Sequence, residues 1–128
     1  MSTQTIRIVV AGALLLHGIG HTLGFWKPAR SLPFLTVSQP TLSLIGGIIW
    51  ALTAVGFVAS SMAFYGLLVP ANLWRPLAVV FAVISLVALL LFGRSWPIFN
   101  FICACAANVV ILAALLWLHW LPLAMFSR

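Results

Sequence analysis

Four stretches of this chain, each at least 20 residues long, contain no more than one Lys or Arg apiece. They cover residues 7–26, 41–62, 73–92 and 96–121. An α-helix needs about 20 mainly apolar residues to cross a hydrocarbon core about 30 Å thick. We therefore predict an all-α integral membrane protein with four transmembrane helices.

Proline and glycine mark the connections between these stretches. Pro33 and Pro40 bracket the first expected loop, and Gly93 lies in a tight third connection. Short connections make consecutive helices antiparallel neighbours. The expected architecture is a single domain over residues 1–128, an up-down-up-down bundle in which the first and fourth helices can touch.

The sequence has no Asp or Glu, and 65% of its 128 residues are hydrophobic. Mechanisms that use a side-chain carboxylate are therefore excluded, among them carboxylate metal sites and acid/base glycosidases. Four spans with short loops also leave no room for a soluble catalytic domain, and no phosphate-binding glycine motif is present. We expect a protein that is not an enzyme.

The six basic residues are dispersed along the chain rather than gathered in a patch, which argues against nucleic acid as a partner. They also divide evenly between the two predicted membrane sides. Arg7, Arg75 and Arg128 fall on one side, and Lys27, Arg30 and Arg94 on the other. The positive-inside rule therefore gives no orientation, and insertion in both directions, as an antiparallel homodimer, is one hypothesis.

His17 and His21 are the most conspicuous polar residues within the apolar stretches. They lie one helical turn apart and so share a face of the first helix. Counting about 1.5 Å per residue from Arg7 places His17 about 15 Å deep, near the middle of the bilayer, and His21 about 6 Å further on. Polar groups at that depth are rare and are candidates for function.

Other polar residues are expected at a similar depth. Asn108 of the fourth helix, Thr53 of the second and Ser85 of the third complete the predicted intramembrane polar site. Cys103 and Cys105 also fall near this level, although they point to different sides of their helix, about 200° apart.

Three interpretations of the histidine pair stay open. The two rings can simply bond neighbouring helices. They can instead bind Zn or Cu, with Cys103 or Cys105 as a further ligand, or a haem or other pigment. Finally, they can form the polar layer of a small transporter or a proton or solute conductance. Cofactors therefore stay unknown, with none the preferred expectation.

Small residues suggest close helix packing. Ala13, Gly20 and Gly24 lie with His17 on one stripe of the first helix, and Gly46 and Gly47 lie on the second. From these faces we predict an accessory or scaffolding subunit that packs in a homo-oligomer or a larger membrane complex. The expected location is a bacterial inner membrane.

The four spans and the balanced charge resemble the small multidrug transporters, and this resemblance implies proton-coupled cation export. That family works through a membrane-embedded Glu in its first helix. The present sequence has His17 and His21 in its first helix and no acidic residue, so the export mechanism does not transfer to it.

Overall fold

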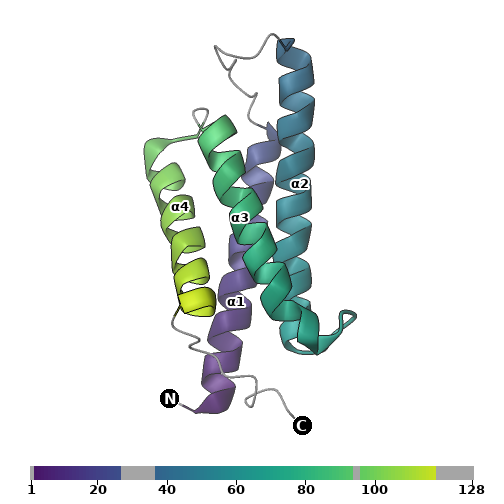
Figure 1. Ribbon diagram of the computed structural model, residues 1–128, viewed down its shortest axis with the longest axis vertical. Coiled ribbons are helices and arrows are strands. Elements are labelled where there is room, and N and C mark those ends of the chain that lie inside the picture. The colour runs from purple at the N-terminus through teal and green to yellow at the C-terminus, as the bar shows by residue number, and fades with distance from the viewer. Residues whose placement is uncertain (1, 27–36, 94–95, 118–128) are drawn as a thin grey trace.

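The computed structural model describes residues 2–26, 37–93 and 96–117. These residues form four long helices that run alternately up and down beside one another (Figure 1). The helices are α1 (Thr3–His21), α2 (Gln39–Phe64), α3 (Trp74–Phe92) and α4 (Ile98–Leu112). Short helical segments η1 (Thr22–Trp26), η2 (Ala71–Leu73) and η4 (Ala113–Trp117) extend or precede them. The predicted all-α, four-helix fold is confirmed.

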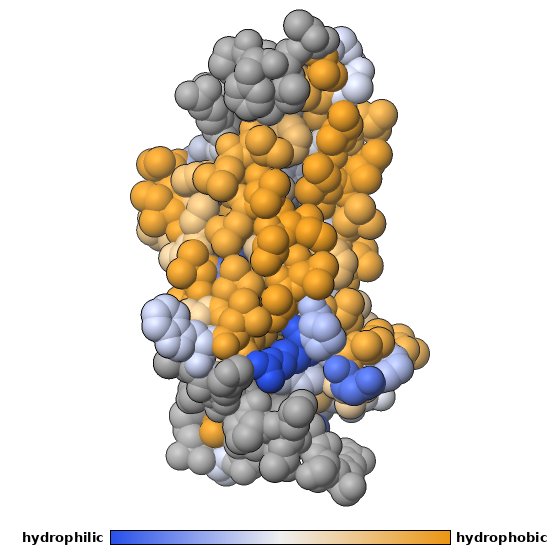
Figure 2. Space-filling view, in the orientation of Figure 1, coloured by the Kyte–Doolittle hydropathy of each residue, from blue (hydrophilic) through white to orange (hydrophobic). Residues whose placement is uncertain are grey.

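Each of the four spans is long and apolar enough to cross a membrane. Figure 2 shows the corresponding surface, a broad hydrophobic band with hydrophilic residues gathered toward one end. Large apolar side chains such as Leu16, Leu90 and Ile98 are exposed. Such a surface suits contact with lipid, which is an apolar solvent.

Capping residues explain why two helices begin earlier than expected. The Ser2 hydroxyl accepts a hydrogen bond from the Thr5 amide at 3.1 Å, so α1 begins at Thr3. Ser38 caps α2 in the same way, and Pro40 lies within the first helical turn. Pro40 is therefore part of α2, and the prediction that it bounds the preceding loop is wrong. Residues 118–121 of the last predicted span lie outside the described residues.

Packing follows the order of the chain. α1 contacts α2, α2 contacts α3, and α3 contacts α4, whereas α1 and α4 meet at few points. Two apolar clusters fill the interior, one around Phe57, Phe64 and Trp74, the other around Trp50 and Leu89. Along the length of the helices, buried polar side chains from α1, α3 and α4 lie between these two clusters. These side chains form the candidate site.

Near the N-terminal end of α1, arginines are held by the protein itself. The guanidinium of Arg7 lies over the Tyr65 ring, 5.3 Å from its centroid. Arg75 donates a hydrogen bond to the carbonyl oxygen of Leu115 in η4. Cations beside helix C-terminal carbonyls are favourable, and this end of the bundle matches the polar end of the surface in Figure 2.

Candidate functional site

Four polar side chains from three helices form a closed ring of hydrogen bonds, which we call the polar ring: His17 and His21 of α1, Ser85 of α3 and Asn108 of α4. His17 Nε2 lies 2.9 Å from Asn108 Oδ1, and Asn108 Nδ2 donates to Ser85 Oγ at 2.7 Å. Ser85 Oγ lies 3.0 Å from His21 Nε2, which is 3.3 Å from His17 Nε2. The ring therefore joins α1, α3 and α4.

The hydrogen-bond partners favour one protonation state for each imidazole. An amide oxygen can only accept, so His17 Nε2 must donate its proton to Asn108. Ser85 already accepts from Asn108 and can donate its hydroxyl proton to His21 Nε2. His21 Nε2 is then an acceptor, and its proton resides on Nδ1. We thus infer two different tautomers within the ring.

This assignment leaves one donor unsatisfied. His21 is only 1% exposed, and its Nδ1 has no hydrogen-bond partner among the described residues. A buried N–H without an acceptor costs about 1–3 kcal/mol. The polar ring closes because the one proton on His17 Nε2 is shared between Asn108 Oδ1 and His21 Nε2. His21 Nδ1 is left without a partner among the described residues.

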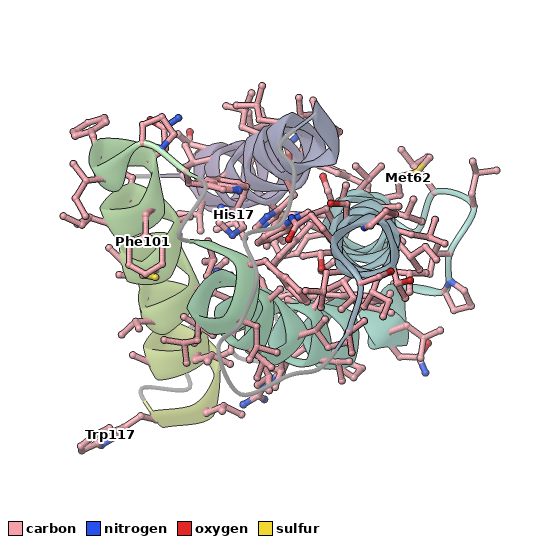
Figure 3. All side chains as sticks on the ribbon, turned by 90° about the horizontal axis from the view of Figure 1, so that it is seen from above. His17, Met62, Phe101 and Trp117 are labelled. Atoms are coloured by element: carbon pink, nitrogen blue, oxygen red, sulfur yellow. The ribbon has the colours of Figure 1, made fainter. Side chains whose placement is uncertain are left out.

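Aromatic rings enclose the histidines on the side of α2. The His21 ring stacks between Trp50 and Phe57, with centroid distances of 5.5 and 5.7 Å. His17 meets Phe57 edge to face at 4.6 Å. Viewed from above, His17 points from α1 toward the interior of the bundle (Figure 3). These contacts pack against both imidazole rings and shield them from lipid on that side.

The opposite side of the histidines is open. A cleft of 430 Å³ lies between α1 and α4, and we call it the polar cleft. Its lining comprises Ala13, Leu16, His17, Gly20, His21, Leu23, Trp96, Asn100, Cys103, Ala104 and Ala107. Ligand sites in proteins commonly occupy about 300–1,000 Å³, so this space is large enough for a small molecule.

A second space continues along the same pair of helices. This apolar groove has a volume of 280 Å³ and shares Ala13, His17 and Ala107 with the polar cleft. Its other walls are apolar side chains of α1, α3 and α4, together with Leu115 of η4. The bond between His17 and Asn108 thus bridges a long opening that contains polar groups on one side and is almost wholly apolar on the other.

Of the five residues predicted for the polar site, the structure brings four together. Thr53 is the exception. It is fully buried, but its hydroxyl donates to the carbonyl oxygen of Ile49 in its own helix at 2.8 Å. Thr commonly bonds the preceding turn in this manner, which commits its one donor to its own helix. Trp96 is not among the residues predicted for the site, but its buried Nε1 also lacks a partner among the described residues.

The predicted metal ligands do not assemble. Within the described ranges, no three His, Cys, Asp or Glu side chains are grouped as metal ligands. Cys103 is exposed and lines the polar cleft, whereas Cys105 packs against the cluster around Trp50. Their separation on the helix explains this, because residues two apart point in different directions.

The predicted small-residue stripe also divides. A Cβ added to Gly24 would lie 2.6 Å from the Trp50 ring, so this glycine permits a contact inside the bundle. Gly46 is buried, whereas Gly20 and Gly47 have open space where a Cβ would point. Ala13 and Gly20 line the polar cleft. These residues therefore serve partly for internal packing and partly to leave an opening.

Comparison with known proteins gives no family for this chain. Neither the models of protein families, nor the curated proteins, nor the solved structures contain a match. Its function must be inferred from the polar ring and the adjoining spaces.

Proposed function

We propose that this protein is a non-enzymatic membrane protein that binds a lipid-soluble ligand between α1 and α4. The observation that supports this most strongly is the incomplete polar ring beside an open cleft. His21 lines the cleft and has a buried N–H without an acceptor. A ligand that supplies an acceptor would remove the cost of that unpaired group.

The position of the cleft determines how a ligand would enter. The cleft lies between helices in the part of the bundle that lipid surrounds, about 15–21 Å from the Arg7 end. A molecule dissolved in the bilayer could reach it sideways, without crossing the apolar core. We therefore expect the ligand to partition into membranes rather than to arrive from water.

Transport through the histidine layer is a second candidate, supported by the polar residues His17, His21 and Asn100 in the lining of the polar cleft. The polar cleft reaches Asn100 and Trp96, near the start of α4, and so approaches one membrane surface. Beyond His17 the opening becomes apolar. This arrangement favours a cleft that opens toward one membrane surface over a continuous polar path across the membrane.

The scaffolding role stays a prediction, as do the oligomer and the bacterial inner membrane. Its basis was the abundance of small residues. Gly18 and Gly24 contact α2 closely, and Gly56 contacts Phe81 of α3. Because these contacts lie within one chain, they account for much of the small-residue pattern without a partner protein.

The proposed binding can be tested by filling the cleft. Gly20 lines it and has no atom within 4 Å of an added Cβ, so Gly20→Leu should occupy the space without disturbing the fold. Gly47→Leu is the matched control, because Gly47 is equally unobstructed but lies on α2 outside the cleft. Small molecules that copurify with each protein would be extracted and compared by mass spectrometry.

We expect wild type and Gly47→Leu to retain a lipid-soluble compound that Gly20→Leu lacks. An identical set of bound molecules in all three proteins would contradict the proposal. Metal analysis and an optical spectrum of the same samples test the metal and pigment hypotheses. A metal or chromophore that depends on His17 and His21 would replace the lipid-soluble ligand as the function of the site.

A further inference from the structure

Two unpaired donors lie in the wall of the polar cleft. His21 Nδ1 and Trp96 Nε1 are both buried and have no acceptor among the residues that the structure describes. Their rings are neighbours, with centroids 6.3 Å apart, and both residues line the cleft. A ligand with oxygen acceptors on a compact head group could bond one or both after a small rotation of the rings.

The head group should be neutral. Among the described residues, none that lines the polar cleft is Lys or Arg, so these residues offer a carboxylate or phosphate no counterion. A charged group at this depth in the hydrocarbon would be strongly unfavourable. Phospholipids and fatty acids, whose charged groups stay at the membrane surface, are therefore poor candidates.

The shape of the opening indicates a flat head and an apolar tail. Trp96 forms an aromatic wall of the polar cleft, and aromatic faces favour stacking with planar rings. The apolar groove begins where the polar cleft ends, at Ala13, His17 and Ala107. It continues along α4 and η4 past Val110 and Ala114. One molecule could therefore occupy both spaces.

We propose that the site binds a neutral quinone lipid, in which a planar ring with carbonyl oxygens is attached to an apolar chain. The carbonyl oxygens accept hydrogen bonds from His21 Nδ1 and Trp96 Nε1, and the chain lies in the apolar groove. This inference rests on the proposed function and adds the chemical class of the ligand. It concerns binding alone and invokes no electron transfer.

Equilibrium binding of radiolabelled decylubiquinone to the detergent-solubilised full chain tests the head-group site. We expect saturable binding to wild type and to Gly47→Leu, and affinity at least about tenfold weaker for Gly20→Leu, since the added side chain occupies the space of the ring. Equal affinity in Gly20→Leu and wild type would overturn the proposal.

The tail site has its own pair of variants. Ala114→Phe places a large side chain in the apolar groove, whereas Ala106→Phe adds the same side chain at an exposed position that lines neither space. Ala114→Phe should weaken decylubiquinone binding and leave the tail-less 2,3-dimethoxy-5-methyl-1,4-benzoquinone unaffected. Loss of both probes, or of neither, would contradict the proposed position of the chain.

A neutral lipid without a ring separates this inference from the proposed function. If dioleoylglycerol binds in a manner sensitive to Gly20→Leu and decylubiquinone does not bind, the ligand class is wrong and the proposed function stands. If neither probe binds and wild type copurifies with the same molecules as Gly20→Leu, both fail.

Discussion

The two sides of α1 are packed very differently. Toward α2, a Cβ added to Gly18 would lie 3.0 Å from the Ala54 carbonyl oxygen and from Phe57 Cβ. Toward α4, a Cβ on Gly20 would meet no atom within 4 Å. In lipid, helices associate through close packing and hydrogen bonds rather than through the hydrophobic effect. The side of α1 that faces α2 associates through close packing, whereas the side that faces α4 depends on the hydrogen bond between His17 and Asn108.

The largest effect should follow from adding bulk on the packed side. Gly18→Leu should destabilise the protein by about 3 kcal/mol, because the new side chain meets the backbone of α2, which cannot move aside easily. Gly20→Leu should change stability by less than about 1 kcal/mol, since its side chain enters open space. Unfolding in mixed micelles of increasing denaturing-detergent content measures both. Equal losses would abolish the contrast between the two sides.

The next largest effect concerns the bridge across the open side. Asn108→Ala removes the hydrogen bonds to His17 and Ser85 and should cost about 2 kcal/mol in the same unfolding assay. A double-mutant cycle with His17→Ala should give a coupling energy of about 0.6–1.7 kcal/mol. A coupling near zero would show that His17 and Asn108 do not bond in the folded protein.

A matched pair of buried serines sharpens the comparison within the bundle. Ser85→Ala breaks the polar ring, leaving Asn108 Nδ2 and His21 Nε2 each without one partner. Ser60→Ala removes a single bond, to the carbonyl oxygen of Trp74 at 2.7 Å. Ser85→Ala should therefore be the more destabilising by about 1 kcal/mol. The reverse order would argue against a closed ring.

The smallest perturbation uses the two cysteines as reporters. Cys103 is exposed in the polar cleft, and Cys105 is partly buried against the apolar cluster around Trp50 and Leu89. In single-cysteine variants, a membrane-permeant maleimide should label Cys103 faster than Cys105. Decylubiquinone should slow labelling of Cys103 alone. Faster labelling of Cys105 would mean that α4 is rotated so that Cys105, and not Cys103, faces the polar cleft.

The fold and much of the site could be predicted because membrane spans leave a strong sequence pattern. The lengths of apolar stretches fix the number of helices, and the rise per residue fixes depth. Depth alone was enough to associate Ser85 and Asn108 with the histidine pair. The end of α2 was harder, since residues beyond Phe64 are also apolar but form a turn in which Gly66 and Leu68 have positive φ angles.

What depth could not give was the direction in which each side chain points. Thr53 lies at a suitable level and bonds its own helix instead, and Cys105 faces away from the histidines. Trp74, the first residue of α3, turns its ring inward, where it is only 2% exposed and packs beside Phe64. The direction of a side chain depends on how its helix is rotated about its own axis. Hydrophobicity specifies this rotation poorly when the protein interior and the surrounding lipid are both apolar.

Solid-state ¹⁵N NMR of the histidine side chains in bilayers tests the central claim most directly. A His119→Asn background leaves only the two histidines of the polar ring. The account predicts two neutral imidazoles in different tautomers, His17 protonated at Nε2 and His21 at Nδ1, and a shift of the His21 Nδ1 signal when decylubiquinone is added. Two rings protonated at the same nitrogen, or two imidazolium ions, would contradict it.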